Sequence, residues 1–89
     1  MLTQIKLIIR DNSPLCSKIA KEFMKLSGEY SGVKFITESI NNNYSAVIDI
    51  QRNGCYNLPC VIKTNDIGID YCKPIKNIKD LKKLLNEEK

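Results

Sequence analysis

The sequence has no histidine, and it has no long uninterrupted run of apolar residues. Without histidine, any zinc site in this chain would have to draw its soft ligands from cysteine. Without a run of about 20 apolar residues, no segment is suited to cross a membrane as a helix. The first six residues lack the basic start and apolar segment of a secretory signal, so we expect a cytoplasmic protein.

The length and composition are those of one small globular domain. We expect the 89 residues to form a single domain, 1–89, because apolar residues make up 43% and charged residues 27% of the chain. The net charge is +4, but the lysines are spread along the chain instead of being clustered. We therefore expect no nucleic-acid partner, and we expect an anionic small molecule or an acidic protein surface to suit the mildly basic face.

The four cysteines, Cys16, Cys55, Cys60 and Cys72, allow several interpretations. An even number of cysteines in a short secreted chain would predict a disulfide framework, but the missing signal argues against one. Cys55 and Cys60 form only a C-x4-C pair, which is a weak indication of metal binding. A four-thiolate metal site is thus a distant alternative, and we expect no metal ligands.

The first forty residues predict a strand, a helix and a second strand. Residues 2–9 are typical of a buried strand, and apolar residues then recur at helical spacing from Leu15 to Leu26, with Gly28 as the expected stop. Residues 33–37 predict the second strand. This order indicates a right-handed βαβ unit in which the two strands are parallel.

The second half is less uniform. Residues 44–52 favour a strand by their β-branched content, but their apolar residues also fit one face of a helix. Residues 60–64 and 67–71 predict a hairpin with a turn at Asn65-Asp66 and a bulge at Gly68. Asn77 is expected to cap a last helix, which carries apolar residues at helical spacing: Ile78, Leu81, Leu84 and Leu85.

A short motif joins the first strand to the first helix. Ser13 is a good N-cap and Pro14 suits the first helical position, with Cys16 in the first turn. Ser-Pro-Leu-Cys differs from a Cys-Pro-x-Cys redox motif by one atom, an oxygen at residue 13 in place of a sulfur. Taken alone, the motif is more typical of a plain helix cap, followed by a cysteine that packs as a small apolar residue.

The element order, this motif and Leu58-Pro59 before the third strand together resemble the glutaredoxin/thioredoxin family over nearly the whole chain. The resemblance implies an α/β thioredoxin-like fold, β-α-β-α-β-β-α, with a four-stranded mixed sheet and about three helices. It therefore predicts a helix at residues 44–52. It also implies a cis Pro59, whose missing N–H leaves the preceding backbone free to pair with an extended substrate.

The resemblance also implies roles for individual residues. Ser13 falls on the nucleophilic cysteine and Cys16 on the resolving cysteine, while Arg10 falls on a basic residue that many glutaredoxins carry. The residues implied to bind substrate are Arg10, Pro14, Leu15, Asn57, Leu58 and Pro59. The family's Gly-Gly-Asp segment would fall near residues 71–73 and is absent, which weakens the assignment of glutathione in particular.

The chemistry of the family requires a thiolate. A helix N-terminus and a nearby cation lower the pKa of a cysteine thiol, whereas a serine hydroxyl does not ionise at neutral pH without a base and forms no S–S bond. The chain as written is thus expected to lack dithiol activity. Ser13 is either an engineered replacement of cysteine or a natural residue, and the sequence leaves this open.

Two functions follow. One is a glutaredoxin-like thiol–disulfide oxidoreductase that is complete only with cysteine at position 13. The alternative is a redox-inactive binding module for peptides or glutathione. The expected partners are glutathione or a thioredoxin-reductase-type protein and disulfide-containing substrates, with no bound cofactor and a monomeric chain.

The remaining cysteines are expected to have structural roles. We expect Cys60 and Cys72 to be buried and Cys55, in a glycine-containing loop, to be the most exposed thiol. A regulatory Cys55–Cys60 disulfide is a further hypothesis.

Overall fold

The computed structural model describes residues 3–65 and 68–86. Its elements follow the predicted order and are β1 (Thr3–Ile9), α1 (Pro14–Ser27), β2 (Val33–Ser39), α2 (Tyr44–Asn53), β3 (Cys60–Asn65), β4 (Gly68–Pro74) and α3 (Ile78–Asn86). The ambiguous segment 44–52 is a helix, as the resemblance implied. Within the described residues, none of the helices has the length and apolar character that a membrane span requires.

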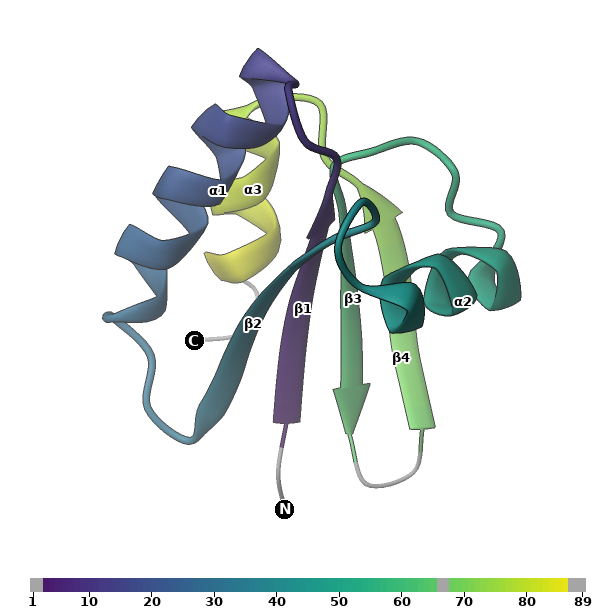
Figure 1. The fold of residues 1–89 in the computed structure, drawn as a ribbon. Coiled ribbons are helices and arrows are strands. Elements are labelled where there is room, and N and C mark those ends of the chain that lie inside the picture. Colours follow the sequence, from purple (N-terminus) through teal and green to yellow (C-terminus); the bar gives the residue numbers. More distant parts are fainter. Residues whose placement is uncertain (1–2, 66–67, 87–89) are drawn as a thin grey trace.

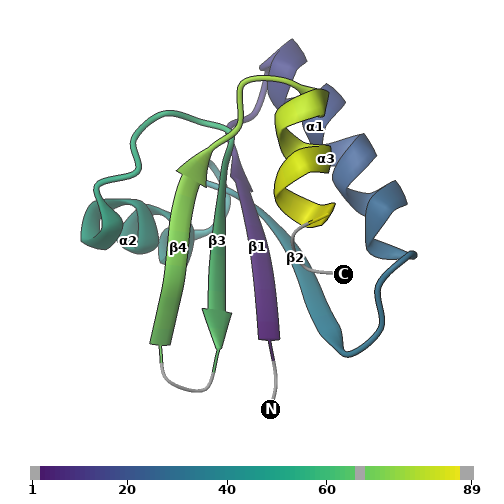
Figure 2. The ribbon, with the colours of Figure 1, turned by 180° about the vertical axis from the view of Figure 1, so that it is seen from behind.

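The four strands form one mixed sheet in the order β2-β1-β3-β4. β1 is parallel to β2 and antiparallel to β3, and β3 and β4 form an antiparallel hairpin, so the predicted pairing is confirmed. Helices α1 and α3 lie on one face of the sheet and α2 lies on the other, as the two opposite views show (Figures 1 and 2). The result is a three-layer α/β/α arrangement.

The larger core lies between the sheet and the α1/α3 layer. Its buried residues are Ile5, Leu7, Ile19, Phe23, Val61, Ile75, Leu81, Leu84 and Leu85. Phe23 meets Phe35 edge-on, with ring centroids 5.4 Å apart. Burial of these apolar side chains on one stripe of each helix fixes both helices against the sheet.

The smaller core lies between the sheet and α2. Its buried residues are Ile8, Ala46, Ile50, Cys55, Cys60 and Ile62, and Cys72 packs against them while partly buried. α2 is therefore held by few side chains. Its helical conformation overrides the local β-propensity because Ala46 and Ile50, four residues apart, face the same core.

Local signals fix the helix ends. The Asn77 side chain accepts a hydrogen bond of 2.8 Å from the backbone N–H of Asp80, so the predicted cap of α3 is confirmed. α1 ends at Gly28 as predicted. The predicted bulge at Gly68 is displaced along the hairpin, because the register shifts between Lys63 and Thr64. The predicted turn at Asn65-Asp66 lies partly outside the described residues.

Candidate functional site

The Ser-Pro-Leu-Cys motif forms the N-terminus of α1. Ser13 has an extended backbone, with φ −110° and ψ 115°, and its Oγ accepts a hydrogen bond of 3.3 Å from the backbone N–H of Cys16. Pro14 occupies the first turn, where its lack of an N–H costs no helical hydrogen bond. The Ser13 oxygen therefore lies at the positive end of the helix, among N–H groups that have no partner within the helix.

The side chains of the motif differ in their access to solvent. Cys16 is only 1% exposed, whereas Ser13 is partly buried and Leu15 is 40% exposed. Pro14 is also exposed, as is Arg10, which follows the end of β1. Cys16 is therefore less accessible to solvent than residue 13.

The loop between β1 and α1 is held to the loop after β2. The backbone N–H of Asp11 donates to Asn41 Oδ1 at 2.8 Å, and the Ser39 hydroxyl donates to Asp11 Oδ1 at 2.7 Å. Asn12 has a positive φ of 60°, a conformation that asparagine tolerates better than most residues. These contacts give the helix start a defined position at the end of the sheet.

Leu58-Pro59 lies at the same end of the sheet. The Leu58–Pro59 peptide bond is cis, which is the isomer that the resemblance implied. Ile8 pairs with Cys60 in the antiparallel β1–β3 register, so Pro59 lies beside the point where β1 leaves the sheet toward α1. Pro59 is buried, Leu58 is partly buried and Asn57 is exposed.

Comparison with known proteins was made by sequence and by structure. No family model matches the sequence, and no curated protein matches it. Among solved structures, the chain is similar to oxidised thioredoxin from Plasmodium falciparum, with a TM-score of 0.79 and 15% identity over 97% of this chain and 80% of that one. Thioredoxin from Fasciola hepatica gives a TM-score of 0.79 and 16% identity over 98% and 81%. Thioredoxin f2 from Chlamydomonas reinhardtii gives 0.76 and 18% over 98% and 79%.

The chain has the thioredoxin fold. The resemblance predicted from the sequence is thus confirmed at the level of architecture. The thioredoxin fold also accounts for the common location of the α1 N-terminus and Pro59, which the topology brings to one end of the sheet.

The three other cysteines of this thioredoxin-fold chain lie on the opposite, α2 side. The prediction that Cys55 is exposed is wrong, because its side chain is only 7% exposed. Gly54 adopts a left-handed conformation with φ 64° and ends α2, and Cys55 then packs against the small core. Cys60 is fully buried as predicted, whereas Cys72 is only partly buried.

These three cysteines form what we call the three-cysteine cluster. The sulfur atoms of Cys55, Cys60 and Cys72 all lie within 4.8 Å of one another, and the structure shows them as free thiols. Cys16 is not part of this group, so the four cysteines do not assemble into one site. By sequence spacing, only Cys55 and Cys60 are close together. The face shared by Cys60 and Cys72 follows from the β3–β4 register, which pairs Cys60 with Pro74 and Ile62 with Cys72.

The surroundings of the cluster disfavour thiolates in the absence of a counter-charge. Burial raises the pKa of Cys60, and the neighbouring Cys55 and Cys72 raise it further. Burial and the interaction with Cys55 raise the pKa of Cys72 to about 12. Cys60 and Cys72 are therefore protonated at neutral pH in the absence of a bound cation.

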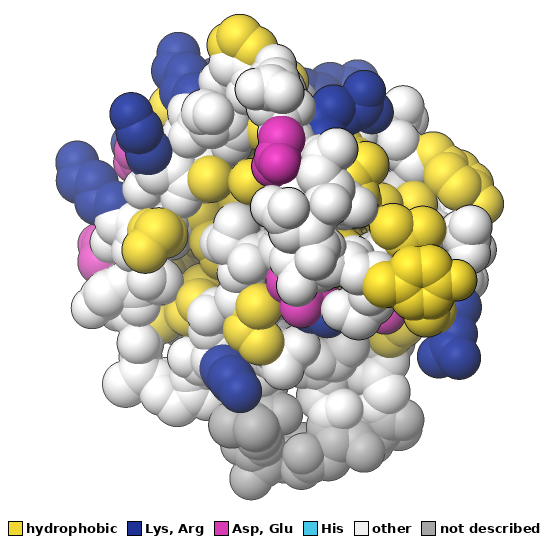
Figure 3. Space-filling model, viewed as in Figure 1, with side chains coloured by type: hydrophobic (Ala, Val, Ile, Leu, Met, Phe, Trp, Pro, Cys, Tyr) yellow, Lys and Arg dark blue, Asp and Glu magenta, His cyan; other side chains and the backbone are white. Residues whose placement is uncertain are grey.

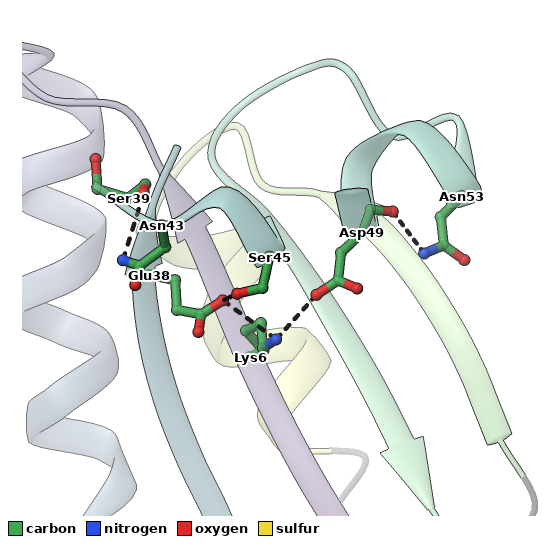
Figure 4. Close-up of polar contacts among 7 residues, drawn as sticks. All are labelled: Lys6, Glu38, Ser39, Asn43, Ser45, Asp49 and Asn53. Carbon is green, nitrogen blue, oxygen red and sulfur yellow. Dashed lines mark hydrogen bonds and ion pairs between the residues drawn. The ribbon is translucent and has the colours of Figure 1, made fainter. Parts of the chain in front are cut away.

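An ionic network lies under α2 (Figure 4). Lys6 Nζ, from β1, lies 3.2 Å from Glu38 Oε1 and 2.9 Å from Asp49 Oδ2. Burial alone would lower the pKa of Lys6, but the hydrogen bonds and negative charges of Asp49 and Glu38 together raise it. This network joins β1, β2 and α2.

The outer surface on the α2 side carries apolar side chains. Figure 3 shows hydrophobic side chains gathered where α2 lies, with lysine and arginine side chains spread around the edges of the view. Tyr44 at the start of α2 is 78% exposed, and Tyr56 after it is 64% exposed.

Proposed function

We propose that the end of the sheet formed by the α1 N-terminus and Pro59 is a glutaredoxin-like thiol–disulfide exchange site with serine at the nucleophile position. The observation that carries the proposal is the 3.3 Å hydrogen bond from the Cys16 N–H to Ser13 Oγ. An atom at this place is directly opposite the helix N-terminal donors. A sulfur at position 13 would face the same backbone N–H groups, which stabilise a thiolate.

Two neighbouring side chains would complete the site. Arg10, at the end of β1, contributes a positive charge on the same loop, which favours an anion at position 13. Cys16 lies one turn into α1 and is shielded from solvent. Its position one turn into α1 supports a role as the thiol that reacts with a sulfur at position 13, and its burial would protect it from outside thiols.

In the Ser13→Cys form, exchange proceeds in two balanced steps. The thiolate at position 13 attacks one sulfur of a substrate disulfide, which breaks the substrate S–S bond and releases the other sulfur as a thiolate. Cys16 then loses its proton and attacks the sulfur at position 13, releasing the second substrate thiolate. Two protein thiols are oxidised to one disulfide as the substrate disulfide is reduced. Glutathione or a thioredoxin-reductase-type protein would restore the dithiol.

With Ser13 in place, neither step can occur, because the hydroxyl forms no exchangeable bond to sulfur. The alternative function, a binding module for peptides or glutathione, is favoured by one observation: Ser13 already has a structural role as the N-cap of α1. The exposed side chains of Pro14, Leu15 and Asn57 would then provide the contact surface. In either function we propose a monomer that acts in the reducing cytoplasm.

The test compares three variants: the chain as written, Ser13→Cys, and Ser13→Cys combined with Cys16→Ser. Each is assayed for reduction of a protein disulfide and of a glutathione mixed disulfide, with glutathione and with a thioredoxin-reductase system as reductant. We expect the chain as written to be inactive and Ser13→Cys to reduce both substrates. The double variant should lose reduction of the protein disulfide and retain exchange with the mixed disulfide, which needs one thiol.

If Ser13→Cys folds but stays inactive with both reductants, the exchange site is not present. Binding of glutathione or of extended peptides by the chain as written, measured by calorimetry, would then support the binding module. A folded Ser13→Cys variant is verified by circular dichroism before the assays, so that inactivity is not confused with unfolding.

A further inference from the structure

The three-cysteine cluster is separate from the α1 site and has no part in the proposed exchange reaction. Its members come from three segments: Cys55 from the loop after α2, Cys60 from the start of β3 and Cys72 from β4. α2 lies on the opposite face of the sheet from α1 (Figures 1 and 2). A function of the cluster therefore has to be sought in the cluster itself.

The spacing of the sulfur atoms suits a metal ion. A tetrahedral zinc site with Zn–S bonds of about 2.3 Å places its sulfurs about 3.8 Å apart. All three sulfurs here are already within 4.8 Å of one another. No pair has to approach by more than about 1 Å, which rotation about the side-chain bonds can supply. A disulfide would need a sulfur–sulfur distance of about 2.05 Å and would leave the third thiol unused.

The positions of the three sulfurs are set by the backbone. Cys60 and Cys72 lie diagonally across the β3–β4 ladder on the same face, where Ile62 pairs with Cys72. The left-handed Gly54 that ends α2, with φ 64°, directs the chain so that Cys55 faces the same place. Two of the three ligands thus lie on paired strands and the third directly follows the end of α2, which lowers the entropic cost of binding an ion.

The surface of the molecule opens onto the cluster. A pocket of ≈ 130 Å³ is lined by Cys55 and Cys72, together with Tyr56, Asn57 and Pro74. It is large enough for a water molecule, which occupies about 30 Å³ in the liquid. The pocket gives an ion a path to the sulfurs, and it gives a bound ion a fourth position open to water or to an outside ligand.

From these observations we infer that Cys55, Cys60 and Cys72 form a site for one Zn²⁺ ion, with three thiolates as ligands and the fourth position open to the pocket. Zinc prefers thiolate ligands, and three protein ligands with an open fourth position is one of its common geometries. The Asp49 carboxylate does not supply the fourth ligand, because it is paired with Lys6 at 2.9 Å. Binding releases the three thiol protons and leaves a local charge of −1, with no change in oxidation state.

The test is zinc binding by the reduced chain as written, measured by calorimetry and by metal analysis after dialysis. Co²⁺ serves as a second probe, because thiolate ligation gives it intense charge-transfer absorption. We expect one Zn²⁺ per chain and the Co²⁺ absorption. Loss of a residue that only hydrogen-bonds to a metal ligand typically weakens metal affinity roughly 10–100-fold. Cys72→Ser and Cys55→Ser each remove a ligand, so each should weaken zinc binding by more than this.

Cys16→Ser is the matched control, because it removes a buried thiol that lies outside the cluster. It should bind zinc as tightly as the chain as written. Absence of zinc binding by the folded chain would overturn the inference. Equal weakening of zinc binding by Cys16→Ser and Cys72→Ser would also overturn it, as would binding of Cu⁺ with no binding of Zn²⁺. Each of these experiments measures metal binding, so their results do not depend on whether Ser13→Cys has exchange activity.

Discussion

The two faces of the sheet bury different kinds of side chain. Among the residues that the structure describes, the core under α1 and α3 contains nine buried apolar residues and an edge-on pair of phenylalanine rings, and the one buried cysteine of α1, Cys16, lies outside this core. The face under α2 buries six residues, two of which are cysteines, with Cys72 partly buried beside them and a lysine bonded to two carboxylates nearby. The first face is thus built mainly for packing, and the second places sulfur and charge together.

The difference separates two kinds of sulfur chemistry in one small chain. The α1 N-terminus favours an anion at position 13, but that position carries a serine in place of a second thiol beside Cys16. The three-cysteine cluster has three thiols, but burial there opposes an anion unless a cation arrives. The proposed exchange reaction would use the first environment, and the inferred metal site would use the second. The effects of substitutions on the two faces should therefore differ in size and in kind.

The largest effect is expected on the packing face. Phe23→Ala removes a side chain that is 1% exposed and contacts Phe35, so it should lower the free energy of unfolding by about 3–5 kcal/mol. Met24→Ala, at the neighbouring residue that is 70% exposed, should change it by less than about 0.5 kcal/mol. Urea denaturation measures both. Similar losses for the two variants would contradict the assigned core.

A smaller effect is expected from the ionic network under α2. Lys6→Met removes two ion pairs and leaves Glu38 and Asp49 only partly solvated, so it should cost about 1.5 kcal/mol. The matched control is Lys82→Met. Lys82 Nζ lies 3.8 Å from Glu22, and its side chain is 55% exposed, so the loss should be below about 0.5 kcal/mol. Equal losses in urea denaturation would show that the Lys6 network is no stronger than a surface pair.

The Lys6 network should also give a pH signature. The pKa of Lys6 is raised above its ordinary value of 10.5 in the folded state, so the stability from Lys6 is fully present below about pH 10.5. It is lost as the pH rises above that value and through the folded-state pKa. The difference in free energy of unfolding between the chain as written and Lys6→Met should thus shrink at higher pH. A difference that grows with pH would contradict this.

Loss of the α1 cap should lower the free energy of unfolding by about 1 kcal/mol. Ser13→Ala removes the hydrogen bond to the Cys16 N–H and should destabilise the chain by that amount, seen as a lower Tm. Ser13→Cys should lose part of the same stability, since a thiol is a weak acceptor. As a control, Ser27→Ala at the exposed end of α1 should have little effect. An unchanged Tm for Ser13→Ala would show that the serine is not needed as a cap.

The last effect appears only at high pH and comes from thiol ionisation in the cluster. The pKa of Cys72 is raised from 9.0 to about 12 on folding, so above about pH 9 the unfolded chain loses a proton that the folded chain keeps. The free energy of unfolding should then fall as the pH rises from 9 toward 12. Cys72→Ser should show a shallower fall, measured by denaturation under reducing, metal-free conditions. If the free energy of unfolding falls equally with pH in the two proteins, folding does not raise the pKa of Cys72.

Most of the fold follows from periodicity and end signals in the sequence. The α1 stripe, the Ser13 and Asn77 caps and the hairpin are local features, and each is found where the sequence predicts it. Residues 44–52 are different, because their β-branched side chains favour a strand. Only the packing of Ala46 and Ile50 on the second face of the sheet makes this segment a helix.

The two sulfur regions differ in how far the sequence reveals them. The α1 region lies within four consecutive residues, so the motif alone places Ser13 and Cys16. The three-cysteine cluster joins residues 55, 60 and 72 through the strand register and the turn at Gly54, neither of which the spacing encodes. For the same reason, Cys55 was predicted to be exposed although the turn buries it.

The most direct test of the exchange site is the ionisation of a thiol placed at position 13. In Ser13→Cys combined with Cys16→Ala, the rate of alkylation of that thiol is followed against pH, and peptide mapping separates it from the other three cysteines. The helix N-terminus and Arg10 should hold its pKa well below the ordinary value of about 8.5. A thiol at position 13 that titrates at or above about 8.5 in the folded variant would show that this helix start does not activate sulfur.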